Sequence, residues 1–189
     1  MKNIAVFVSG SGTNCENIIR HFAGSSGAGV ALVVSNRSDA CALVRAARQG
    51  VPSVVVSRGE LSDKGYMLRL MQDYSIDFIV LAGFLPVVPD FLIEAYPRRI
   101  VNLHPALLPR FGGKGMYGRH VHEAVKAAGE KETGMTVHYV SATVDGGEII
   151  AQFRTPLEET DTPEDIAEKE HALEMEHFPQ VIENLINKL

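Results

Sequence analysis

The chain has no tryptophan, only two cysteines, and no excess of basic residues. Cys15 and Cys41 are too few for a disulfide framework or a cysteine metal site, and we expect both to be small core residues of helices. The formal net charge of −5 argues against nucleic-acid and membrane-surface binding, although one loop can still bind a phosphate locally. No apolar run is long enough to span a bilayer, and the N-terminus lacks the apolar region of a signal peptide. We therefore expect a cytoplasmic protein with reduced thiols.

Apolar residues make up 46% of the 189-residue chain, as expected for a globular protein. In the first half of the chain, short apolar runs alternate with helical patterns. The apolar runs predict strands at 4–8, 30–34, 53–56, 78–82 and 99–103. Helical spacing between them predicts helices at 15–22, 39–49, 63–74 and 90–95. This alternation is typical of a Rossmann-like, mostly parallel sheet with helices on both faces.

The second half has a different pattern. A Gly-rich loop at 111–118 precedes a predicted helix at 120–128. Two strand-like runs, 134–141 and 148–155, are separated by a turn at 143–147, which predicts an antiparallel C-terminal addition to the sheet. Thr162 and Pro163 begin a final helix that runs to about Phe178, with 180–188 as a continuation beyond Pro179. Since no linker or repeat is visible, we expect a single domain over 1–189.

Asn102-Leu103-His104-Pro105 is the most informative stretch. On extended backbone, Asn102 and His104 point to the same side, so an amide donor and a titratable ring can meet at one atom. Such a pair can stabilise an oxyanion, and it stands at the carboxyl end of a strand, where ligands of open α/β sheets bind. Alternatively, His104 is a core residue bonded to a carbonyl, and Asn102 closes a turn.

The loop Gly10-Ser11-Gly12-Thr13-Asn14 joins the first strand to the first helix. Glycines let backbone N–H groups approach a ligand, and a helix N-terminus favours an anion. The loop is neither a Walker A motif nor a complete dinucleotide fingerprint. Phosphate binding and a tight turn in which Thr13 or Asn14 caps the helix are both compatible with it.

Asp145 precedes Gly146-Gly147 and is either an ordinary turn residue or a partner of His104. As a partner it would raise the pKa of His104 above its reference of about 6.5. Four other histidines show no zinc spacing, and we expect no metal; they are His120, His122, His171 and His177.

Together these motifs resemble the phosphoribosylglycinamide formyltransferases, folate-dependent enzymes of purine biosynthesis. The resemblance covers nearly the whole chain, in order. It is carried by Gly-Ser-Gly-Thr-Asn at 10–14, Ser-Asn-Arg-Ser-Asp-Ala at 35–40, Leu-Ala-Gly-Phe at 81–84, Asn-Leu-His-Pro-Ala-Leu-Leu-Pro at 102–109, Asp-Gly-Gly at 145–147, His-Ala-Leu-Glu at 171–174 and Phe-Pro at 178–179. The segments at 102–109 and 145–147 are shared by several formyl-folate enzymes, whereas the loop at 9–14 is specific for the glycinamide ribonucleotide enzyme.

The resemblance implies the formyltransferase fold and a set of ligand contacts. The ribonucleotide is expected at Gly12, Thr13, Asn14 and Glu174. Formyl-folate is expected at Lys64, Leu85, Pro86, Val87, Val88, Asn102, Ser141, Ala142, Thr143, Val144 and Asp145. Leu85-Pro86 replaces a frequent Met-Arg, Lys64 replaces a frequent Arg, and the loop at 111–118 is longer than usual.

The resemblance also implies a reaction. The amine of glycinamide ribonucleotide attacks the formyl carbon of 10-formyltetrahydrofolate, Asn102 and protonated His104 donate to the formyl oxygen, and Asp145 keeps His104 charged and helps move the proton. A deformylase or a methionyl-tRNA formyltransferase usually carries a further domain, for which we expect no room. The remaining alternative is a nucleotide-binding module that uses the loop at 10–14 alone. We expect a monomer or a homodimer.

Overall fold

The computed structural model describes residues 1–189 and divides them into two compact units. The first unit comprises Met1–Val101 and Ile182–Leu189, and the second comprises Asn102–Val181. The single domain over 1–189 stays a prediction. None of the helices is both long enough and apolar enough to cross a membrane.

The first unit is built on parallel strands in the order β3-β2-β1-β4, with β4 followed in the sheet by the start of β5. The strands are β1 (Lys2–Val8), β2 (Ala28–Ser35), β3 (Ser53–Val55), β4 (Phe78–Leu81) and β5 (Ile100–His104). Residues 4–8 and 78–81 are all buried, as expected for strands covered on both faces. The predicted parallel sheet is confirmed.

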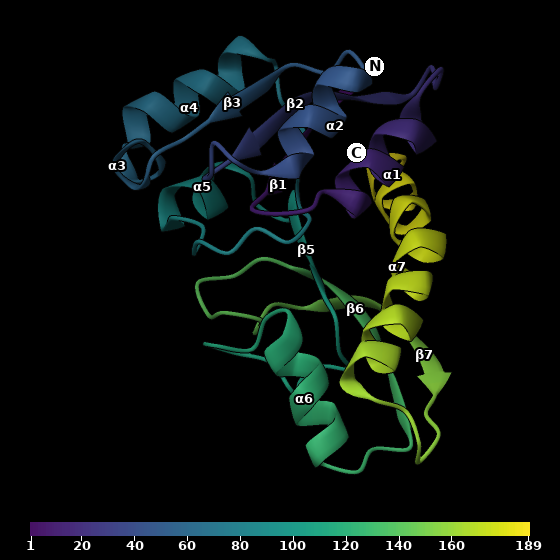
Figure 1. Ribbon diagram of the computed structural model, residues 1–189. Coiled ribbons are helices and arrows are strands. Elements are labelled where there is room, and N and C mark those ends of the chain that lie inside the picture. Colours follow the sequence, from purple (N-terminus) through teal and green to yellow (C-terminus); the bar gives the residue numbers. More distant parts are fainter. The chain divides into compact units, whose positions relative to one another are not determined.

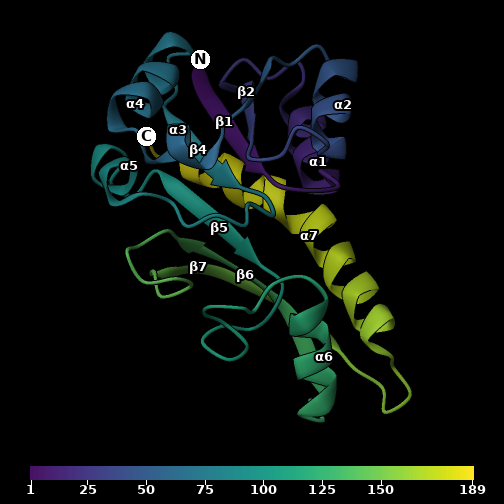
Figure 2. The same ribbon diagram turned by 60° about the vertical axis from the view of Figure 1, so that its left-hand side comes forward.

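Helices cover both faces of the sheet in this unit. In Figure 2 its strands lie between α1 (Thr13–Phe22) and α2 (Cys41–Arg48) on one side and α4 (Lys64–Asp73) and α5 (Asp90–Ala95) on the other. The short α3 (Arg58–Ser62) was not predicted. It begins with a capping box, in which Ser57 and Glu60 satisfy each other's backbone N–H groups.

The two cysteines differ in their surroundings. Cys15 is buried in α1, and burial raises the pKa of its thiol to about 12. Cys41 is the first residue of α2 and is exposed, so the prediction that both are core residues was wrong for Cys41. It begins its helix at a position outside the apolar face that Ala42 and Ala46 bury.

The second unit contains the end of β5, β6 (Glu132–Tyr139) and β7 (Ile149–Pro156), in that order. β6 and β7 pair antiparallel and run side by side in Figure 1, which confirms the predicted addition. α6 (Arg119–Ala127) precedes them and α7 (Pro163–Ile186) follows. α7 continues through Pro179, so the two predicted helical segments are one helix.

A small apolar cluster joins α6 to α7 within the second unit. Its buried members are Ala106, Val121, Val125 and Ile166, and the half-buried side chains of Phe111, Met116 and Leu157 pack against it. The Gly-rich loop is therefore anchored by two of its own side chains. Tyr117, in contrast, is exposed.

Candidate active site

Asn102 and His104 lie at the end of β5, where Pro105 ends the strand. The segment that follows is held by Thr136 of β6, whose hydroxyl donates to the Ala106 carbonyl (2.6 Å) and accepts from the Leu108 N–H (3.1 Å). Buried polar groups paired in this way fix the backbone around the strand end. His104 itself is 3% exposed.

Asp145 meets His104, as the sequence suggested. The Nδ1 of His104 lies 3.5 Å from the Oδ2 of Asp145, and the two side chains are 4% and 10% exposed. Asp145 has a positive φ of 53° in the turn between β6 and β7. It is therefore both a turn residue and a partner of His104.

Gly147 allows the backbone of this turn to approach β6 closely. A Cβ at Gly147 would lie 1.7 Å from the carbonyl oxygen of Tyr139, far inside van der Waals contact. Only a residue without a side chain lets the turn return this close to β6. Two residues before Gly147, Asp145 thereby comes near the histidines of the strands.

His138 joins the cluster and was not identified from the sequence. Its Nε2 lies 3.0 Å from the Nδ2 of Asn102 and 3.6 Å from the Oδ1 of Asp145, while its Nδ1 lies 2.9 Å from the Tyr139 carbonyl oxygen. Because a carbonyl only accepts, Nδ1 carries a hydrogen, and Nε2, when it carries none, accepts from Asn102. The second amide hydrogen of Asn102 then remains for a substrate oxygen.

The beginning of the Gly-rich loop contacts both catalytic candidates through its backbone. The Phe111 carbonyl oxygen lies 2.7 Å from the Nε2 of His104. The Gly113 N–H donates to the Oδ2 of Asp145 at 2.9 Å. His104 thus has an oxygen near each ring nitrogen.

The expectation for the pKa of His104 was wrong in sign. Burial lowers the pKa below its ordinary value of 6.5, and this outweighs Asp145 and the Phe111 carbonyl, which act in the opposite direction. His138 lowers it further. The His104 ring is therefore mainly neutral at neutral pH, and Asp145 does not keep it charged.

Asp145 stays ionised. Burial acts to raise its pKa, but the nearby His138 side chain, the hydrogen bond from the Gly113 N–H and the attraction to His104 lower it below its usual value of 3.8 overall. The cluster thus combines an amide donor, a neutral imidazole able to take a proton, and a fixed carboxylate that favours the protonated ring.

The loop at 10–14 lies in the first unit and leads into α1. No side chain caps the N-terminus of this helix. Gly12 is the N-cap residue, with φ 74° and no side-chain hydrogen bond to the helix end. The alternative in which Thr13 or Asn14 caps α1 is therefore wrong. A Cβ at Gly12 would lie 2.5 Å from the Cα of Ala42, so the loop packs directly on the start of α2.

The remaining predicted ligand positions differ in exposure. In the first unit Lys64, Leu85 and Val87 are exposed, whereas the side chain of Val88 is buried and is not available to a ligand. In the second unit, residues 141–145 form the turn before β7 and are exposed or half-buried. The Oε2 of Glu174, on α7, lies 3.2 Å from the Nδ1 of His171, and this hydrogen bond raises the pKa of His171.

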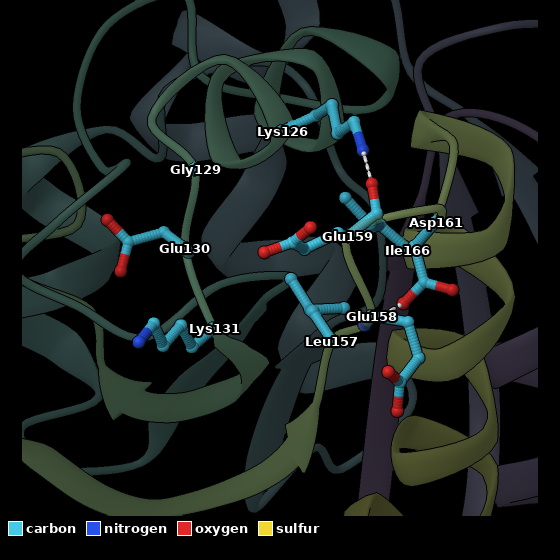
Figure 3. Close-up of a pocket in the computed structure, with 9 residues that line it drawn as sticks. All are labelled: Lys126, Gly129, Glu130, Lys131, Leu157, Glu158, Glu159, Asp161 and Ile166. Carbon is cyan, nitrogen blue, oxygen red and sulfur yellow. Dashed lines mark hydrogen bonds between the residues drawn. The ribbon is translucent and has the colours of Figure 1, made fainter.

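The second unit also has a cavity of about 390 Å³ that is lined by none of these residues. It lies between the ends of α6 and β7, where Lys126 points to the Glu159 carbonyl oxygen and donates to it at 2.8 Å (Figure 3). No group of three or more His, Cys, Asp or Glu side chains is arranged to hold a metal ion.

The class of protein follows from comparison with known families. A family model described as formyl transferase matches residues 2–182, so the chain belongs to the formyl transferase family. The predicted fold class, an α/β sheet of formyl transferase type, is confirmed.

Within that family the chain is similar to several phosphoribosylglycinamide formyltransferases. The chloroplastic enzyme of Arabidopsis thaliana is 39% identical, over 98% of this chain and 67% of its own length. That of Bacillus subtilis is 35% identical, over 98% of this chain and 95% of its own. The crystal structure of glycinamide ribonucleotide transformylase 1 from Symbiobacterium toebii has a TM-score of 0.90 and 35% identity, over 100% of this chain and 89% of that one.

Proposed function

We propose that this chain transfers the formyl group of 10-formyltetrahydrofolate to the amine of 5′-phosphoribosylglycinamide, a step of purine biosynthesis. The carrying observation is the cluster at the end of β5, in which Asn102 contacts His138 and His104 contacts Asp145, so that an amide donor, an imidazole and a carboxylate lie in one site. The relatives named above, matched over nearly the whole chain, support the choice of substrates.

The first step is attack of the substrate amine on the formyl carbon. A carbon–nitrogen bond forms, and the formyl oxygen becomes an oxyanion. The free amide hydrogen of Asn102 donates to that oxygen. One such donor typically contributes about 3 kcal/mol to transition-state stabilisation.

The second step is movement of one proton from the attacking nitrogen to the leaving folate nitrogen. Neutral His104 takes the proton, and Asp145 stabilises the charged ring because the two are 3.5 Å apart. His104 then delivers the proton as the bond between carbon and the folate nitrogen breaks. This order differs from the initial hypothesis of a permanently charged His104, and it follows from the lowered pKa.

We assign the ligand contacts to the positions that the resemblance implied. Gly12, Thr13 and Asn14 would bind the phosphate at the N-terminus of α1, and Glu174 would contact the ribonucleotide. Formyl-folate would contact Lys64, the backbone at 85–88 and the turn at 141–145. Val88 would contribute only its backbone, since its side chain is buried.

A transfer assay with purified protein tests this function. With both substrates present, we expect deformylated folate to form only when the acceptor amine is added. His104→Ala and Asp145→Asn should each reduce kcat by about 10²- to 10⁴-fold. His120→Ala is the matched control, since that histidine is largely exposed on α6, and it should retain the wild-type rate.

The other outcomes separate the alternatives. Folate turnover without the acceptor would identify a deformylase. Nucleotide binding without any turnover would identify a binding module and contradict the proposal. Near-normal rates in folded His104→Ala and Asp145→Asn would disprove the assignment of these residues.

A further inference from the structure

We propose that the backbone of Phe111–Gly113 decides which nitrogen of His104 exchanges the proton: the Phe111 carbonyl keeps a hydrogen on Nε2, and the proton of the reaction is taken up at Nδ1, facing Asp145. This inference rests on the proposed function and adds a positioning role for a loop. The loop itself would contact neither substrate in this role.

A hydrogen-bond acceptor faces Nε2 of His104. The Phe111 carbonyl oxygen lies 2.7 Å from that nitrogen and has no hydrogen to give. The contact is therefore a hydrogen bond only when Nε2 carries the hydrogen. In a neutral ring this leaves the lone pair on Nδ1, so the next proton binds there.

The carboxylate of Asp145 faces the other ring nitrogen of His104. Nδ1 of His104 is 3.5 Å from Asp145 Oδ2, which is too long for a full hydrogen bond but short enough for strong attraction to a charged ring. The Gly113 N–H donates to the same oxygen at 2.9 Å. The loop therefore holds in place the carboxylate that attracts a proton at Nδ1.

The backbone at Phe111 is held in an unfavourable conformation. Phe111 has a positive φ of 56°, which costs a non-glycine residue free energy. Its ring packs against the cluster formed with Ala106 and Val121, and this packing holds the backbone as it is. Phe111 thus links a core contact on one side to the His104 contact on the other.

The direct test is an NMR measurement of His104 in the whole protein, labelled with ¹⁵N at histidine. We expect the neutral ring to carry its hydrogen on Nε2 and the titrating signal to be that of Nδ1. Finding the hydrogen on Nδ1 would overturn the inference. Because no turnover is needed, a failure of the proposed function would appear separately, as a wild-type protein that does not transfer formyl groups.

A matched pair of variants tests the Gly113 contact. Gly113 (φ 97°) and Gly115 (φ 90°) lie in the same loop, and a Cβ at either has no atom within 4 Å. Alanine therefore strains both positions similarly, but only Gly113 donates to Asp145. We expect Gly113→Ala to lower kcat about tenfold with little change in either KM, and Gly115→Ala to stay within about twofold.

A second pair tests Phe111. Phe111→Ala removes the ring but keeps a side chain at positive φ, so the carbonyl should leave His104. Phe111→Gly also removes the ring but relieves the strain, and it should restore part of the lost rate and the Nε2–H form of the ring. Equal rates and equal His104 spectra in the two folded variants would contradict the role of the carbonyl.

Discussion

At the residue scale, the chemistry of His104 depends on a balance between burial and a counter-charge. The ring is 3% exposed, and burial penalises its charged form more than Asp145 and the Phe111 carbonyl favour it. A proton taken from the substrate is therefore held weakly and is easily passed on. This suits a group that must both accept and deliver within one reaction.

Asp145→Asn tests that balance. Removing the carboxylate removes an influence that raises the pKa of His104, so we expect this pKa to fall further below 6.5. An NMR titration of the His104 ring measures it, and His120 provides an exposed reference signal in the same sample. An unchanged or increased pKa of His104 would show that Asp145 does not act on the ring.

The sequence predicted part of this site. Alternation along the strand placed Asn102 and His104 on one side, and the turn motif supplied Asp145 as a partner. The sign of the pKa shift required the depth of burial, which a motif does not contain. His138 was missed because it looks like an ordinary strand residue, and the register shift between Val137 and His138 is not visible in the sequence.

At the element scale, the N-cap residue of α1 is a glycine that packs directly against the start of α2. Gly12 approaches Ala42, and the Gly10 carbonyl accepts from the Ala42 N–H at 3.2 Å. The loop is thus tied to the start of α2 before any ligand binds. Such preorganisation of backbone N–H groups favours anion binding.

Gly12→Ala should disturb this loop and Gly10→Ala should not. At Gly12 the new Cβ would meet Ala42 at 2.5 Å with φ 74°, whereas at Gly10 nothing lies within 4 Å. We expect Gly12→Ala to lower the free energy of unfolding by about 1–3 kcal/mol and to raise the KM for the ribonucleotide, and Gly10→Ala to stay within about 0.5 kcal/mol. Urea denaturation and steady-state kinetics measure both. Equal effects of the two variants would show that the contact with Ala42 is unimportant.

Most elements followed from the apolar pattern, because residues 4–8 of β1 and all of β4 are continuously buried and α1, α2 and α6 each bury one apolar face. The exceptions have local causes. The five-residue α3 is too short for a periodic signal, although Ser57 and Glu60 give the pattern of a capping box. The continuity of α7 through Pro179 depends on tertiary packing, since Phe178 and Ile182 on either side are fully buried.

At the scale of the whole molecule, stability should depend on a buried carboxylate in the second unit. Glu170 of α7 is 1% exposed, accepts a hydrogen bond from Thr133 of β6, and has the Nδ1 of His122 of α6 at 2.7 Å from its Oε2. That close approach has the distance of an ion pair but not the geometry of a hydrogen bond. Burial raises the pKa of Glu170, while His122 and Thr133 lower it and Glu174 raises it.

Glu170→Gln measures the cost of that charge. A raised pKa means that the group contributes stability below its unfolded pKa of about 4.3 and that this contribution is lost as pH rises through the folded pKa. Gln keeps the acceptor for Thr133 but cannot ionise. Between pH 4 and pH 7 we therefore expect the free energy of unfolding of the variant to rise relative to that of the wild type. The rise should be about 1.4 kcal/mol for each unit by which the pKa is raised, and urea denaturation measures it. A difference that is constant with pH would contradict this.

The close approach of Gly147 to Tyr139 has a consequence for how the gene tolerates change. In a library of all single substitutions, we expect replacements at Asp145 to yield folded, abundant and inactive protein. Replacements at Gly147 should instead yield little protein, since every side chain collides with the backbone of β6. Scoring abundance and activity separately would therefore show that Asp145 is constrained by its role in the reaction, whereas Gly147 is constrained by the folding of the turn.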